Sequence, residues 1–147
     1  MAKIGLFEKT PERWFDFDND TEVLLKHVSK EALAALMEKA EKVSKKTGIK
    51  PAVAYDVFLG RAAVLNWRKK DDHDHPGFLL PDGALFNFTP ENRDRLMRLY
   101  REFSSFVFTN STLATGFLEN DAIEPVTDDD LFGLEDLIAD DETEPKN

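Results

Sequence analysis

The sequence predicts an α+β fold, a small and mainly helical domain with two short β-hairpins followed by a disordered acidic C-terminal tail. Apolar residues recur at helical spacing in several runs, and short β-rich runs flank turn-forming clusters. Charge divides the chain as well. Residues 119–147 carry 12 acidic side chains and one basic one, whereas residues 1–118 carry 17 acidic and 18 basic ones. We therefore expect a compact body over 1–118 and a largely disordered tail over 119–147.

The first hairpin is predicted near the N-terminus. Residues 13–17 contain three aromatic side chains and have period-2 character, and a cluster rich in Asp and Asn follows at 18–21. A second β-rich run then spans 22–28. Two such runs around a turn-forming cluster are typical of a β-hairpin.

Two helices are predicted next. Ser29 is a favourable N-cap for the first, and Gly48 suits the left-handed position after its last turn. A second helix begins at Pro51 and is expected to continue through Trp67. The buried stripe of the first helix contains Leu33, Leu36, Met37, Ala40 and Val43.

A second hairpin and a third helix complete the body. Pro81-Asp82-Gly83 separates the apolar runs 78–80 and 84–88, which is a turn signal. Thr89 and Pro90 then mark a helix start. Its predicted buried stripe contains Leu96, Leu99, Tyr100, Phe103, Phe106 and Val107, and a weaker helical piece follows at 113–118. The predicted core of the whole body comprises Trp14, Leu25, Leu33, Leu36, Trp67, Leu96, Tyr100 and Phe103.

A metal site is considered for the loop at residues 71–75, whose sequence is Asp-Asp-His-Asp-His. Neither calcium-loop frame fits, because Gly83 or His27 stands where the bidentate Glu is required. A zinc site needs a third ligand, and His27 is the remaining histidine outside this loop. A flexible polar loop is the favoured interpretation, with no metal and no cofactor.

Catalytic and nucleic-acid-binding functions are disfavoured. The chain has no cysteine, and its sequence lacks a nucleophile elbow, a Walker loop, a dinucleotide fingerprint and a zincin motif. Basic residues of the body are interleaved with acidic ones, including the arginines at 93, 95, 98 and 101. No apolar stretch is long enough to span a membrane. We expect a non-enzymatic cytoplasmic protein that binds neither nucleic acid nor membrane.

The tail contains an apolar segment at 131–139 within its acidic residues. Burying its five large side chains would contribute about as much free energy as ordering the segment costs. The segment is therefore either a solubilising tail or a recognition element that folds into a partner's groove, and the second interpretation is favoured. The predicted partner-binding residues are Leu131, Phe132, Leu134, Leu137 and Ile138.

The order of these runs resembles the tail assembly chaperones encoded in long-tailed, siphovirus-like phages and prophages. The resemblance covers residues 12–109 and lies in an ordered set of runs, none of which is diagnostic alone. The loop at 71–76 is richer in Asp and His than this family pattern. The runs that carry the resemblance are 14–17, 23–29, 66–68, 82–83, 88–92 and 102–107.

This resemblance implies a non-enzymatic assembly factor in the host cytoplasm. Its partners would be the tail tape-measure protein, the tail tube protein, or both, during tail morphogenesis. Two alternatives stay open: a structural virion component, such as a tail-completion or head–tail connector protein, and a small acidic regulator that binds a basic host protein. The sequence leaves open whether the chain forms a homo-oligomer.

The chain's last residues carry one further expectation from the resemblance. Such phages often make a longer chaperone by slipping back one nucleotide near the end of the first reading frame. Pro145-Lys146-Asn147 is compatible with the slippery codons CCA AAA AAC. A longer product that shares residues 1–147 is therefore a hypothesis, and the gene sequence tests it.

Overall fold

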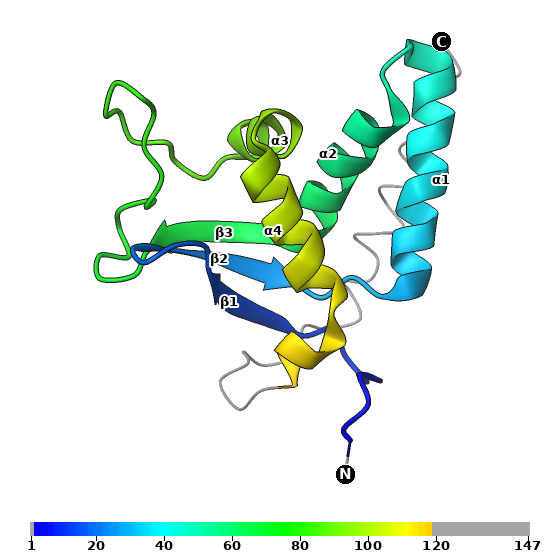
Figure 1. Ribbon diagram of the computed structural model, residues 1–147, viewed down its shortest axis with the longest axis horizontal. Coiled ribbons are helices and arrows are strands. Elements are labelled where there is room, and N and C mark those ends of the chain that lie inside the picture. Colours follow the sequence, from blue (N-terminus) through cyan, green and yellow to red (C-terminus); the bar gives the residue numbers. More distant parts are fainter. Residues whose placement is uncertain (1, 119–147) are drawn as a thin grey trace.

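The computed structural model describes residues 2–118 (Figure 1). The predictions for the acidic tail, for its segment 131–139 and for the end of the chain lie outside the described residues. Within 2–118 the α+β class is confirmed. In chain order the elements are β1 (Glu12–Asp16), β2 (Thr21–Lys26), α1 (Lys30–Thr47), α2 (Pro51–Ala63), β3 (Val64–Lys69), α3 (Pro90–Leu99), α4 (Arg101–Thr112) and the 3₁₀ helix η1 (Ala114–Phe117).

The three described strands form one antiparallel sheet in the order β1-β2-β3. The predicted first hairpin is confirmed, with Trp14 opposite Leu24 and Phe15 opposite Val23. Val23 in turn faces Trp67 on β3. Because side chains alternate between the faces of a sheet, Phe15, Val23 and Trp67 share the face that packs into the core, while Trp14 and Leu24 share the other.

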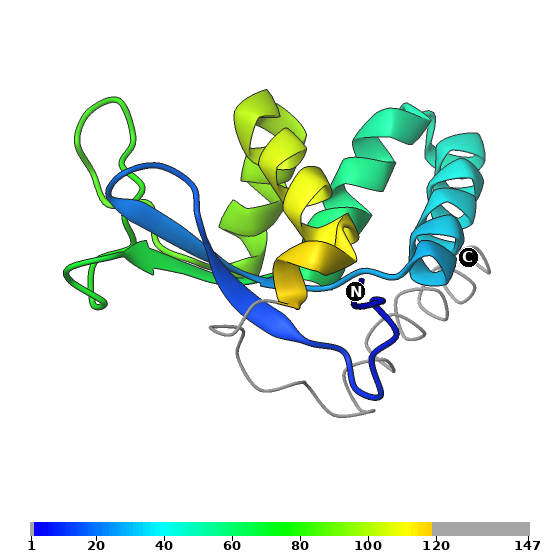
Figure 2. The ribbon, with the colours of Figure 1, turned by 60° about the horizontal axis from the view of Figure 1, so that its bottom comes forward.

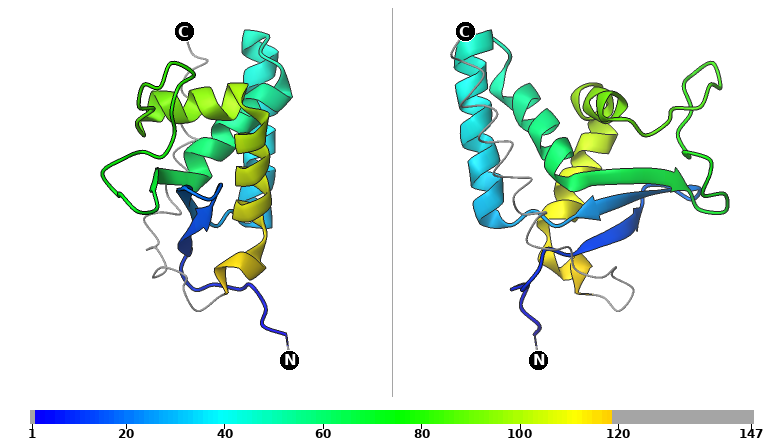
Figure 3. Two further views of the ribbon diagram at one scale, coloured as in Figure 1. Left: turned by 60° about the vertical axis from the view of Figure 1, so that its left-hand side comes forward. Right: turned by 180° about the vertical axis from the view of Figure 1, so that it is seen from behind.

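The helices lie on one side of this sheet (Figure 2). Helix α4 crosses the sheet, α3 lies beside α2, and α1 packs against α2 at the end farthest from the long connection between β3 and α3 (Figures 1 and 3). That connection, residues 70–89, projects beyond the sheet at the opposite end of the molecule. The described body is thus a sheet covered on one face by helices, with an extended loop at one end.

Helix α1 follows the prediction closely at both ends. The hydroxyl oxygen of Ser29 accepts the backbone N–H of Ala32, and Gly48 adopts the left-handed conformation with φ 78°. Leu36 and Ala40 are buried as expected, but Met37 is 55% exposed. Met37 therefore does not belong to the core, because it faces a surface groove instead of the sheet.

The prediction that α2 continues through Trp67 is wrong. The helix ends at Ala63, and the chain enters β3 at Val64 without an intervening loop. Pairing with β2 explains the change, since the backbone of residues 64–69 completes the sheet and brings Trp67 opposite Val23. A partner strand distant in sequence overrides the local helical pattern.

The single helix predicted from Pro90 through Val107 is also wrong, because the chain breaks it at Tyr100. Tyr100 is extended, with φ −114° and ψ 98°, and separates α3 from α4. Met97 of α3 packs against Gly60 of α2, where an added Cβ would lie 2.4 Å from the Met97 Cγ. In one straight helix Met97 and Phe103 would point about 120° apart. The break lets α3 face α2 while Phe103 faces the sheet.

The predicted core is confirmed in its centre and wrong at its edges. Leu25, Leu36, Trp67 and Phe103 are buried, and Leu33 and Leu96 pack partly buried against them. Trp14 is half-buried on the outer face of the sheet, where the Arg68 guanidinium lies 3.8 Å from its ring centroid. Tyr100 is 40% exposed, because the helix break turns it outward.

His27 follows β2 and is buried where the N-terminal segment meets the end of α4. Its Nδ1 hydrogen-bonds to the backbone carbonyl of Ser111 at 2.8 Å, and its ring packs against Phe7 and Phe117. Burial lowers the pKa of His27, and the hydrogen bond to Ser111 opposes that shift in part. The neutral imidazole is therefore the form that suits the folded state.

We predict that replacing Phe103 by Ala costs about 3–5 kcal/mol of unfolding free energy. The Phe103 ring contacts Phe17, Trp67 and Phe78 from three different segments, and the residue is fully buried. Leu99→Ala, from the same predicted stripe, should change stability by less than about 0.5 kcal/mol because Leu99 is exposed. Urea unfolding of both variants tests the pair, and equal losses would contradict the helix break.

A second prediction concerns pH. Because the folded-state pKa of His27 is lowered, the unfolded chain binds more protons below the ordinary His pKa of about 6.5. Stability from this residue should be complete above that pH and decline as the pH falls. The decline between about pH 7 and pH 5 should be smaller in His27→Gln than in the wild-type chain, as measured by urea unfolding at each pH. An identical decline in both proteins would contradict the assignment.

Candidate protein-binding groove

The connection between β3 and α3 is anchored on the sheet by Trp67. The buried indole N–H of Trp67 donates to the backbone carbonyl of Phe86 at 3.0 Å. The same indole ring packs against Phe78, Phe86 and Phe88, with ring centroids 4.9–6.0 Å apart. One buried side chain therefore holds three positions of this connection in place.

The predicted second hairpin is present as a tight turn closed by one antiparallel bridge, between Leu79 and Leu85. The Phe86 N–H donates to the Phe78 carbonyl, and the Leu80 N–H donates to the Ala84 carbonyl. At the tip, a carboxylate oxygen of Asp82 accepts the backbone N–H of Ala84 at 2.9 Å. The Pro-Asp-Gly signal thus located the turn, although no extended strands form on either side.

A glycine fixes where this turn leaves the sheet. Gly77 has φ 81°, and its carbonyl accepts a hydrogen bond from the Thr21 hydroxyl at 2.8 Å. A Cβ at this position would lie 2.7 Å from the Thr21 side chain. The positive φ and the close approach both require glycine.

Alternation along the turn segment places apolar side chains on both of its sides. Phe78 and Phe86 point toward Trp67, while Leu79 and Leu85 are 57% and 51% exposed. Exposed apolar side chains gathered in one place often mark an interaction site. The outer side of this segment is therefore the first wall of a candidate site.

Helix α3 and the end of β1 supply the other walls. The groove between them has a volume of about 510 Å³. Leu99, 70% exposed, and Tyr100, 40% exposed, stand at its edge as a result of the helix break. We call this feature the α3 groove. Its apolar lining comprises Phe17, Phe78, Leu79, Leu80, Pro81, Phe86, Leu96, Leu99 and Tyr100.

One arginine lines the α3 groove. It is Arg95, whose guanidinium lies 5.4 Å from the Phe86 ring centroid. Arg98, about one turn further along α3, is exposed. Within residues 2–118 neither of these two arginines has an ion-pair partner. Arg101 of α4 lines a different recess, together with Tyr55 and Asp56.

The acids near the groove are engaged locally. Asp18 also lines it, and its carboxylate accepts the backbone N–H groups of Asp20 and Thr21 at 2.8 and 2.7 Å. Asp82 is likewise hydrogen-bonded within the turn. The α3 groove therefore combines an apolar lining with one arginine, Arg95, whose charge is available to a ligand.

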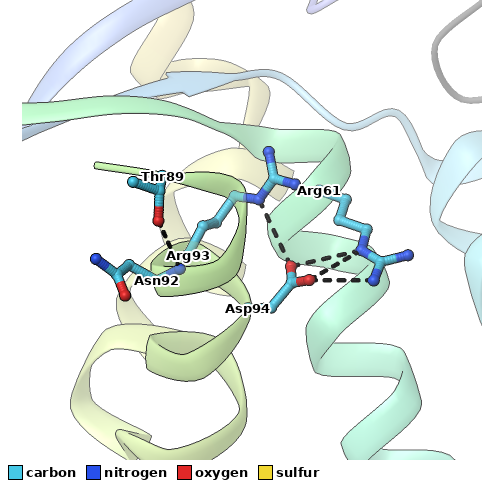
Figure 4. Close-up of polar contacts among 5 residues, drawn as sticks. All are labelled: Arg61, Thr89, Asn92, Arg93 and Asp94. Atoms are coloured by element: carbon cyan, nitrogen blue, oxygen red, sulfur yellow. Dashed lines mark hydrogen bonds and ion pairs between the residues drawn. The ribbon is translucent and has the colours of Figure 1, made fainter. Parts of the chain in front are cut away.

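An ion-pair cluster fixes α3 against α2. Asp94 bridges Arg61 of α2, at 3.1 Å, and Arg93 of its own helix, at 3.7 Å (Figure 4). Burial lowers the pKa of Arg93, and the nearby Asp94 carboxylate counteracts that effect. Beside this cluster the Thr89 hydroxyl oxygen accepts the Asn92 N–H and caps α3, as predicted. Helix α3, which forms one wall of the groove, is thus held in a fixed orientation against α2.

A second apolar groove lies between α1, α2 and α4. Met37 and Phe108 are its exposed members, and Leu33, Ala40 and Tyr55 line it below. Its charged lining residue is Glu41. This groove lacks the lining arginine that marks the α3 groove.

Two titratable groups of α2 lie near a polar recess. Burial raises the pKa of Asp56, and burial together with the Asp56 charge raises the pKa of Tyr55. Both line a recess with Arg101, Ser104 and Ser105. No second carboxyl or imidazole lines this recess among the described residues, so the geometry does not arrange an acid–base pair there.

The predicted metal candidates do not converge in the described part of the chain. The His75 ring nitrogen Nδ1 accepts the Gly77 N–H at 2.9 Å, and Asp72 accepts the Asp74 N–H. His27 directly follows the C-terminal end of β2, whereas this loop begins next to Thr21, at the N-terminal end of the same strand. Among residues 2–118 no three His, Cys, Asp or Glu side chains form a metal-binding group.

The predicted partner-binding residues Leu131, Phe132, Leu134, Leu137 and Ile138 lie outside the described residues. Sequence reasoning did not find the α3 groove, because both apolar runs around Pro81 were assigned to hairpin strands and Leu99 to the core. The available signal was that residues 78–80 and 84–86 are apolar without alternating polar positions.

Comparison with known proteins finds no match: no family model, no curated protein and no solved structure is similar to this chain. In addition, none of the helices within residues 2–118 has the length and apolar character that crossing a membrane requires.

We predict that Leu79→Asp combined with Leu99→Asp leaves the body folded. Both side chains are mostly exposed, so the two changes together should alter the unfolding free energy by about 1 kcal/mol or less. Urea unfolding measures the change, and a loss comparable to that of Phe103→Ala would show that the groove is part of the core.

Proposed function

We propose that this chain is a non-enzymatic tail assembly chaperone of a long-tailed phage or prophage, acting in the host cytoplasm. Its proposed partners are the tape-measure protein and the tail tube protein. The family resemblance over residues 12–109 supplies the class of function. The observation that carries the proposal is the α3 groove, where large apolar side chains stand exposed around one concave surface.

The shape and chemistry of the groove suit a helical partner. An amphipathic helix places its apolar residues three and four positions apart along one stripe, and such a stripe fits a groove lined by leucine and aromatic side chains. Leu79 and Leu80 of the turn segment and Leu99 of α3 all line the groove and are exposed. A tape-measure protein is long and helical in the resembled family, so it offers many such stripes.

The size of the groove indicates that each single groove binds its partner weakly. A few apolar side chains can enter it, and each contributes about 1.5–3 kcal/mol when fully buried. After the cost of association, one such contact would be readily reversible. Several copies on one long partner would shield it collectively, and each could leave when tube subunits replace it.

We predict that co-expression with this chain increases the soluble fraction of the phage's tape-measure protein, and that Leu79→Asp with Leu99→Asp abolishes the increase. Ile49→Asp with Leu113→Asp is the matched control, because these residues are similarly exposed but lie outside the groove. The control should retain the wild-type effect.

A tape-measure protein that is equally soluble with and without this chain would contradict the chaperone assignment. Recovery of the chain in purified virions would instead favour a structural component of the tail.

A further inference from the structure

The charge of the α3 groove points to a ligand with acidic residues around an apolar centre. Arg95 lines it and Arg98 lies about one turn further along α3, and neither has an ion-pair partner in residues 2–118. A basic amphipathic segment would be repelled by this positive charge. An acidic one would be stabilised both by apolar contacts with the lining and by attraction to the arginine.

The chain itself contains such a segment. Residues 131–138 include Leu131, Leu134 and Leu137, and acidic residues flank them at 128–130 and 140–142. Phe132 and Ile138 add two further large apolar side chains. Five apolar side chains between two acidic triplets match an apolar groove that has Arg95 in its lining and Arg98 nearby on the same helix. The described part of the chain contains no other run of this composition.

The connecting chain is long enough for the segment to reach the groove. Tyr100 of the groove directly precedes α4, and Leu118 directly follows η1 after the other end of that helix. The 12 residues of α4 span about 18 Å. Residues 119–130 can cover about 40 Å when fully extended. The reach exceeds the helix length about twofold, so the connection permits the contact within one molecule.

We propose that residues 131–138 occupy the α3 groove of their own chain when no partner is bound. Because the segment is tethered, its effective concentration at the groove is in the millimolar range, which fills the groove even at modest affinity. The acidic segment then shields Leu79, Leu99 and Tyr100 in the free protein. A partner helix must displace it, so the groove is autoinhibited.

Paramagnetic broadening in the free protein tests this docking without any phage partner. The chain has no cysteine, so Ala139→Cys gives a single attachment point for a nitroxide label. In the isotope-labelled full-length protein we expect the backbone signals of Leu79, Leu85 and Leu99 to lose most of their intensity. Signals of Glu38 and Lys42, on the exposed side of α1, should keep theirs.

Two sets of variants separate the apolar and the charged contributions. Leu134→Asp with Leu137→Asp should restore the groove signals, and so should Arg95→Glu with Arg98→Glu. Lys42→Glu with Lys45→Glu is the matched control, because it reverses two exposed positive charges on α1 and should leave the broadening unchanged. Raising the salt concentration should weaken the broadening, since exposed charges are screened.

A mixed sample distinguishes docking within one chain from docking between copies. Isotope-labelled protein without nitroxide is mixed with nitroxide-labelled protein of natural isotope content. Groove signals should remain sharp in this mixture. Equal broadening of the groove signals in the mixed sample and in the doubly labelled protein would overturn the proposal. So would broadening in the doubly labelled protein that is spread evenly over the body. Because no tape-measure protein is present, failure here leaves the proposed function untouched.

Discussion

The position of the long connection between β3 and α3 depends on one buried hydrogen bond, from the Trp67 indole to the Phe86 carbonyl. A buried indole N–H requires an acceptor, and the connection supplies it by lying across the end of the sheet. Phe78 and Phe86 then face inward against the ring. Since neighbouring residues of an extended segment alternate, Leu79 and Leu85 must face outward. The exposed wall of the groove is thus a consequence of satisfying the core.

The opposite wall has a similar origin in the core. Phe103 enters the aromatic cluster from α4, while Met97 packs against Gly60 from α3. Both contacts are satisfied only when the chain breaks at Tyr100, and the break exposes Leu99. The ion pairs of Asp94 with Arg61 and Arg93 keep α3 on that side. Two independent packing requirements therefore leave apolar side chains on facing walls of one groove.

Local signals in the sequence predicted what local interactions determine. The caps at Ser29 and Thr89, the left-handed Gly48 and the turn at 81–83 each depend on a few neighbouring residues, and each was found where expected. The end of α2 depends on strand pairing with β2, and the break at Tyr100 depends on contacts with two different elements. Neither residues 61–67 nor residues 97–103 contain a Pro or Gly that would indicate the end of a helix. The groove depends on both, so the sequence could indicate only its apolar runs at 78–80 and 84–86 and not the exposure of Leu99.

Competition between a tethered segment and a partner would set which partners the groove accepts. A segment with a dissociation constant near 1 mM, about −4 kcal/mol, fills roughly half of the grooves at a millimolar effective concentration. It would weaken an isolated partner helix only about twofold at one groove. When several copies bind one long helix, the twofold weakening applies at each groove. The repeated apolar stripes of the helix also add a binding contact at each groove. A long partner with many regularly spaced apolar stripes would therefore overcome cis docking through its multiple contacts, whereas a short stray helix with one stripe would not gain from them. Such discrimination suits a protein that covers one particular long helix and later releases it.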